Sequence, residues 1–110
     1  MIAKKFKIPK KHIALILQKG ESFDSKLFVI RFWENKVSFP RFRIIVSTKF
    51  AKKAVDRNKT RRRIYEALRL IVKENSNLRP LDIILIPKKQ ILTKEFKEIS
   101  QIAEETITKL

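Results

Sequence analysis

Apolar residues recur along the chain at two spacings, which predict helices and strands in a mixed order. Helical spacing predicts a short first helix from Lys10 to Lys19, with Pro9 near its first turn and Gly20 after its last residue. A long second helix is expected from about Lys53 to Glu74. Thr93 would cap a third helix that ends near Lys109. The buried stripe of the first helix would consist of Ile13, Ile16 and Leu17.

Alternation with a period of two predicts three strands. In the first strand, Lys26 to Trp33, one face would carry Phe28, Ile30 and Phe32, and the other Leu27, Val29 and Arg31. The second strand would extend from Arg41 to Thr48, and the third from Leu81 to Ile86. The third is nearly all apolar, which is typical of a central strand.

These elements predict an α+β domain in which helices pack on a small central β-sheet, in the order α-β-β-α-β-α. A chain of 110 residues fits a single domain, which we assign to residues 1–110. With no cysteine and no apolar run long enough to span a bilayer, the composition favours a soluble protein of the reducing cytoplasm.

Charge then indicates the class of partner. Lys and Arg number 27 against 11 Asp and Glu, which gives a net charge of +16. Such a field attracts polyanions, and each neutralised phosphate releases counterions. Nucleic acid is the expected partner, because the basic residues do not line one amphipathic membrane helix.

The basic residues are densest between Lys49 and Arg63, where eight of them stand against one acid, Asp56. A run of this kind is often only a solvated face. Its helical spacing favours a binding role. An apolar stripe would face the sheet and a basic stripe would border it, while Lys59 and Arg63 would lie toward the opposite side. The apolar stripe is Ile64, Ala67, Leu68, Ile71 and Val72, and the bordering stripe is Asn58, Arg61, Arg62, Tyr65 and Arg69.

The segment VSTKFAKKAVDRNKTRRRIYEALR, Val46 to Arg69, is similar to the signature of the ribonuclease P protein family. A strand ending in Val-Ser-x-Lys is followed by a short basic turn and by Ala-Val-x-Arg-Asn on a helix. The Lys19-Gly20 turn and Pro87 before the last helix also fit, so the resemblance covers nearly the whole chain. The residues that match as they stand are Ala54, Val55, Arg57, Asn58, Arg61, Arg62 and Glu66.

The resemblance implies the protein subunit of ribonuclease P, a ribonucleoprotein endonuclease that removes the 5′ leader of precursor tRNA and generates the mature 5′ end. In that family the RNA carries the catalysis, and magnesium is bound mainly by the RNA rather than tightly by the protein. The implied partners are the ribonuclease P catalytic RNA and precursor tRNA, with no membrane and no obligate protein partner. The implied fold contains a left-handed crossover, against the usual right-handed rule.

Two sets of site residues follow from the resemblance. RNA-binding residues would be Lys49, Lys52, Lys53, Arg57, Asn58, Lys59, Arg61, Arg62, Tyr65 and Arg69. A cleft for the leader, between the first helix, one sheet face and the long helix, would be lined by Ile13, Leu17, Phe28, Ile30, Arg31 and Ser47.

The chain departs from the family pattern at several of these positions. Lys59 ends the Arg-Asn-Arg core and keeps the charge without the planar fork of arginine. Tyr65 replaces a usual arginine, which suggests stacking on a base or ribose. Ile13 and Leu17 replace aromatic residues, so leader affinity is expected to rest more on charge than on stacking.

Other chemistry has weaker support in the sequence. His12 is the only histidine, with no carboxylate indicated nearby, and the acidic residues are scattered. We therefore expect no protein-based catalytic residue and no protein metal site. Trp33 and Phe39 could stack on bases, but core packing is the more common role of aromatic residues at strand ends. Three rival functions stay open: a structural RNA-binding protein, a stand-alone ribonuclease and a sequence-specific DNA binder.

Overall fold

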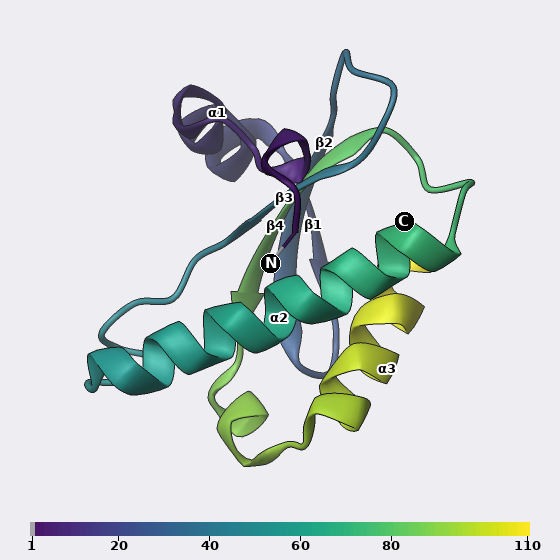
Figure 1. Ribbon diagram of the computed structural model, residues 1–110. Helices are drawn as coiled ribbons and strands as arrows, with labels where there is room; N and C mark the ends of the chain where they lie inside the picture. Colours follow the sequence, from purple (N-terminus) through teal and green to yellow (C-terminus); the bar gives the residue numbers. More distant parts are fainter. Residues whose placement is uncertain (1) are drawn as a thin grey trace.

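A four-stranded sheet forms the centre of the computed structural model, which describes residues 2–110 (Figure 1). Its spatial order is β1-β2-β4-β3. The pairs β1–β2 and β2–β4 are antiparallel, whereas β3 joins β4 in parallel. The strands are β1 (Glu21–Asp24), β2 (Phe28–Glu34), β3 (Arg41–Ile44) and β4 (Leu81–Pro87).

Three α-helices surround the sheet: α1 (Lys10–Lys19), α2 (Ala54–Glu74) and α3 (Phe96–Thr108). Two 3-10 helices, η1 (Lys4–Phe6) and η2 (Lys89–Thr93), precede α1 and α3. The bounds of α1 agree with the prediction, and α2 begins one residue later than expected. None of these helices in residues 2–110 is long and apolar enough to cross a membrane.

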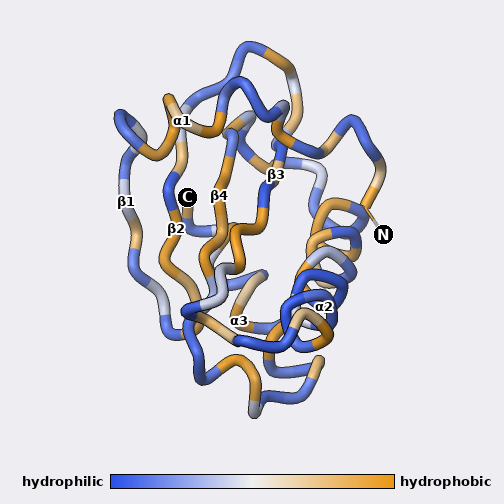
Figure 2. Tube along the Cα trace, turned by 90° about the vertical axis from the view of Figure 1, so that its left-hand side faces the viewer, coloured by the Kyte–Doolittle hydropathy of each residue, from blue (hydrophilic) through white to orange (hydrophobic). Residues whose placement is uncertain are grey.

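Alternate residues of each strand point to opposite faces of the sheet, and different helices cover the two faces. On one face, α2 and α3 cover the main core, where Phe28, Ile30 and Phe42 are completely buried. On the other face, α1 packs through Ile16 against Ile84 of β4. We call this second side the α1 face. Apolar segments of the central strands and polar turns of α2 are visible along the chain trace in Figure 2.

The connection from β3 through α2 to β4 is a crossover between parallel neighbouring strands (Figure 1). Because β3 and β4 are parallel neighbours, the chain must return to the same end of the sheet, and α2 makes this return across the core face. As a result, α2 begins beyond the end of β3, at a corner of the molecule.

Three predicted details are wrong. The strand predicted from Arg41 to Thr48 ends at Ile44, as β3. Strand β1 was not predicted, because in Glu21–Asp24 only Phe23 is apolar and this short edge strand has no clear alternation. Thr93 does not cap α3. Its hydroxyl lies within η2 and donates to the carbonyl of Gln90, and Glu95 occupies the N-cap position of α3 without a side-chain cap.

Candidate RNA interface

The N-terminal end of α2 projects past the sheet (Figure 1). Its first turn has no large buried side chain, and Val55 is 68% exposed. Further along, Ile64, Leu68 and Ile71 are at most 1% exposed and fix the helix on the core. The later turns of α2 therefore anchor the helix on the core, while its first turn, Ala54 to Arg57, is exposed or half-buried.

Two arginines on this projecting end are held by the fold. Arg57 Nη1 donates to the carbonyl oxygens of Ala51 and Lys52, each at 2.8 Å. Arg61 Nη1 donates to Asn58 Oδ1 at 2.8 Å, and its Nη2 lies 3.4 Å from the carbonyl oxygen of Val46. Their positive charges are thus placed before any RNA arrives, which lowers the entropy lost on binding.

Freely exposed polar groups surround these two arginines. They come from the turn before α2 and from its outer side: Lys49, Lys52, Lys53, Asn58 and Arg62. Lys59 and Arg63 lie on the side of α2 that faces η2, where Arg63 Nη1 is 3.4 Å from the carbonyl oxygen of Lys94. The two-sided distribution of charge on α2 thus agrees with the helical spacing.

Tyr65 does not lie on this surface, and the interpretation that it stacks on RNA is wrong. Its side chain is 7% exposed and belongs to the main core. Burial raises the pKa of its hydroxyl, and Lys7 Nζ lies 5.1 Å from the ring centroid. The helical stripe placed Tyr65 beside the basic residues, but η1 and β3 cover that part of α2.

Arg69 is also set apart from the cluster. It lies 12 residues beyond Arg57, about 18 Å along the helix axis. Its Nη2 donates to Glu66 Oε1 at 2.6 Å, and this hydrogen bond lowers the pKa of Glu66 and raises that of Arg69. Because a carboxylate already neutralises it, we expect Arg69 to contribute less to RNA binding than Arg57 or Arg61.

The predicted leader cleft is only partly correct. Phe28 and Ile30 are completely buried on the core face, beneath α2 and α3, and cannot touch a leader. Arg31 points the other way, onto the α1 face, because successive strand residues alternate. Val29 and Trp33 accompany Arg31 on that face of β2, and neither was predicted to line the leader cleft.

Arg31 connects the strand to α1. Its Nη2 donates to the carbonyl oxygen of Leu17 at 2.7 Å, in the last turn of the helix. Leu17 is 38% exposed beside it, whereas Ile13 is half-buried against the Ile8, Ile16 and Ile84 cluster. Ser47 is exposed beyond the end of β3. The α1 face thus brings together Ile13, Leu17 and Arg31, but not Phe28 or Ile30.

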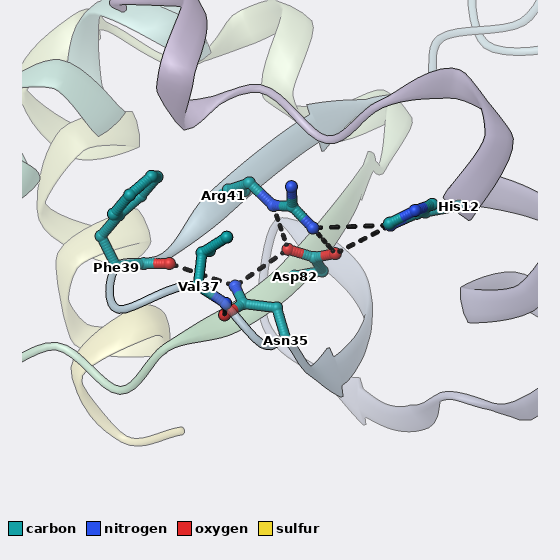
Figure 3. A network of polar contacts seen from close by, with 6 residues as sticks. All are labelled: His12, Asn35, Val37, Phe39, Arg41 and Asp82. Atoms are coloured by element: carbon teal, nitrogen blue, oxygen red, sulfur yellow. Dashed lines mark hydrogen bonds and ion pairs between the residues drawn. The ribbon is translucent and has the colours of Figure 1, made fainter.

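A buried polar network on the α1 face was not predicted (Figure 3). Asp82 is 3% exposed and accepts hydrogen bonds from Arg41 Nε and Nη2, both at 2.8 Å, and from Asn35 Nδ2 at 3.0 Å. His12 Nδ1 lies 3.9 Å from Asp82 Oδ2, so the expectation of no nearby carboxylate is wrong. The hydrogen bonds to Asp82 raise the pKa of Arg41. Since three donors occupy Asp82, the group serves packing rather than acid–base chemistry.

Comparisons with known proteins agree with this geometry. A sequence model of the family Ribonuclease P matches residues 4–110. The chain belongs to the ribonuclease P protein family. It is 39% identical to the ribonuclease P protein component of Rickettsia bellii over 98 residues, which cover 82% of this chain and 80% of that one. It is 37% identical to the component of Thermotoga sp. strain RQ2 over 87 residues, which cover 77% and 69%.

Solved structures of ribonuclease P proteins share the fold. A mutant of the Staphylococcus aureus protein superposes with a TM-score of 0.81 at 30% identity, over 96% of this chain and 87% of that one. The Thermotoga maritima protein in complex with 1-(4-fluorophenyl)-2-thiourea gives 0.79 at 25% identity, over 92% and 95%. Family membership and the α+β fold that the sequence predicted are therefore confirmed.

Proposed function

We propose that this member of the ribonuclease P protein family is the protein subunit of the ribonucleoprotein, and that it promotes removal of the 5′ leader from precursor tRNA. The observation that carries the proposal is the projecting end of α2, where Arg57 and Arg61 are held by backbone and side-chain acceptors among exposed lysines. Fixed cations next to flexible ones suit a folded RNA backbone, which presents phosphates at set positions.

The α1 face would receive the unpaired leader. Arg31 donates there to the backbone of Leu17. The projecting end of α2 would supply further positive charge beyond the end of β3, where Arg61 Nη2 lies 3.4 Å from the carbonyl oxygen of Val46. The protein would raise substrate affinity and lower the magnesium requirement, because its cations replace part of the counterion atmosphere that RNA otherwise needs. We further propose that the holoenzyme works in the cytoplasm.

Catalysis is assigned to the RNA partner in this proposal, and magnesium is assigned mainly to that RNA. Among residues 2–110, no three histidine, cysteine, aspartate or glutamate side chains gather into a possible metal site. The carboxylate of Asp82 is taken up by Arg41 and Asn35. In this proposal the side chains of the interface bind and orient RNA.

The test is cleavage of a precursor tRNA at low magnesium by a bacterial ribonuclease P RNA, with and without this protein. We expect cleavage at the mature 5′ end only when both are present. No stimulation despite tight binding to a matched RNA would favour a structural RNA-binding protein. Hydrolysis by the protein alone would favour the stand-alone ribonuclease.

A further inference from the structure

Helix α1 has a second side that faces away from Ile13 and Leu17. His12, Leu15 and Ile16 follow the i, i+3, i+4 spacing on this side. Between them and the end of β2 lies a cavity of about 360 Å³. A volume of this size falls in the range of small-ligand pockets. The cavity is not part of the surface that contains Leu17.

Large apolar side chains stand open at this cavity. Trp33 is 40% exposed and Leu15 is 43% exposed, and Val37 from the β2–β3 loop lies beside them. The expectation that Trp33 packs into the core is therefore wrong. An exposed tryptophan beside an exposed leucine offers a flat apolar surface, and in a strongly basic protein such a surface suits stacking with a nucleic-acid base.

The floor of the cavity does not repel RNA. Asp82 and Arg41 form it together with Asn35, and the two charges cancel (Figure 3). Both carboxylate oxygens accept from Arg41, so this pair presents no free negative group to the cavity. Glu34 also lines the cavity, where its Oε1 lies 3.4 Å from Arg79 Nη2, and Lys36 adds a positive charge.

A basic groove of about 420 Å³ adjoins the cavity, because Arg41 lines both. Its cations come from the segment before α1, from the first residue of α1 and from β3: Lys4, Lys5, Lys7, Lys10, Arg41 and Arg43. At its other end, Arg43 and Arg31 flank Ile84 on the α1 face. The groove thus leads from the face proposed for the leader to the Trp33 cavity.

We propose that the Trp33 cavity binds an unpaired base of the upstream leader, while the basic groove binds the phosphates that lead to it. This inference rests on the proposed function. A strand with regularly spaced phosphates and flat apolar bases matches a row of cations that ends at an exposed indole. The site extends the leader path around the N-terminal end of α1.

Trp33 is the only tryptophan of the chain and reports on its own site. The full-length protein is titrated at low salt with an unstructured adenosine oligonucleotide, and in parallel with an abasic strand of equal length. Stacking predicts that only the strand with bases quenches the fluorescence. Equal quenching by both strands, or none by either, would overturn the inference.

The second experiment uses the holoenzyme and two precursor tRNAs, one with a short leader and one with an extended leader. Trp33→Ala is expected to weaken affinity for the extended substrate by about tenfold, the loss typical of one stacked base, and to leave the short substrate unchanged. Trp33→Phe should keep most of the affinity. Leu92→Ala, at 43% exposure on η2, is the matched control and should change neither substrate.

These arms separate the inference from the proposed function. Failure of the wild-type holoenzyme to cleave the short substrate would contradict the proposed function itself. If the wild-type holoenzyme cleaves normally and Trp33→Ala changes the affinity for both substrates equally, only the Trp33 site is overturned.

Two controls complete the experiment. Weaker binding of Trp33→Ala to the catalytic RNA alone would also overturn the Trp33 site, since the stacked base would then belong to that RNA. If Trp33→Ala lowers stability in urea unfolding, Leu15→Ser replaces it and must show the same dependence on leader length.

Discussion

Arg41 and Asp82 are register partners on the parallel strands β3 and β4, and the arginine donates to both oxygens of the carboxylate. The pair ties the edge strand β3 to the central strand. It also fixes Asn35, whose amide donates to Asp82 and to the carbonyl of Phe39. One buried ion pair thus anchors both the sheet edge and the β2–β3 loop.

We predict that Asp82→Ala lowers the free energy of unfolding by about 3 kcal/mol, because it leaves Arg41 without a partner at a site 12% exposed. Urea unfolding measures the loss. The control is the exposed pair of Arg79 and Glu34, at 3.4 Å. Glu34→Ala should cost less than about 1 kcal/mol. Equal losses for the two variants would mean that the buried network does not stabilise the sheet edge.

Gly20 provides a second test of the fold. A Cβ at this position would press against the carbonyl oxygen of Ile16 and lie 2.9 Å from that of Phe32. Both obstacles are backbone atoms and cannot rotate away. Gly20→Ala should therefore destabilise the protein by about 1–3 kcal/mol, the usual cost of overpacking. An unchanged midpoint in urea would show that α1 can shift on the sheet.

The patterns that the sequence predicted best are those with long apolar periodicity. The stripe of Ile64, Leu68 and Ile71 is repeated over several turns, so the bounds of α2 were predicted to within one residue. Strand β1 could not be predicted in this way, because an edge strand of four residues buries almost nothing. Its pairing with β2 joins residues five to eleven positions apart, and the apolar spacing within β1 itself does not indicate that partner.

The errors in the candidate site have a different origin. Alternation placed Phe28 and Ile30 on one face of β2 and Arg31 on the other, so the three could not line a single cleft. Tyr65 was misplaced because one helix shows which residues share a side, but not that β3 and η1 would cover that side. The Asp82 network joins positions 41 and 47 residues apart along the chain, and no local pattern indicates it.

Arg57 is predicted to have two separable effects. Arg57→Ala removes hydrogen bonds to Ala51 and Lys52, so the turn before α2 should open and its amides should exchange faster with solvent. RNA affinity should fall as well. Arg62→Ala, an exposed neighbour on the same helix, should weaken RNA binding without changing exchange in the turn. If the amides of the turn exchanged at the same rate in Arg57→Ala and Arg62→Ala, Arg57 would contribute only its charge.

Salt dependence tests whether the exposed lysines contact phosphates. Each phosphate contact removed should reduce the slope of log affinity against log salt by about 0.7 to 0.9. Lys52→Ala and Lys53→Ala together should therefore lower the slope by about 1.5, measured by RNA binding over a salt series. Lys109→Ala, at the far end of α3, is the control. A flat profile for the wild-type protein would count against the whole interface.

The last prediction concerns what holds the leader on the α1 face. Ile13 and Leu17 are aliphatic, and of the two only Leu17 is well exposed on the α1 face. Charge should then dominate: Arg61→Ala is expected to weaken leader affinity by about tenfold, which is the loss of one charge-assisted hydrogen bond. Leu17→Ala should weaken it by less than about threefold, since no aromatic stacking is lost. Binding of precursor tRNA with and without its leader measures both effects.

If Ile13→Ala and Arg61→Ala weakened leader binding equally, apolar contact would matter as much as charge. Ile13 is half-buried against Ile8, Ile16 and Ile84, so its variant also needs a stability control.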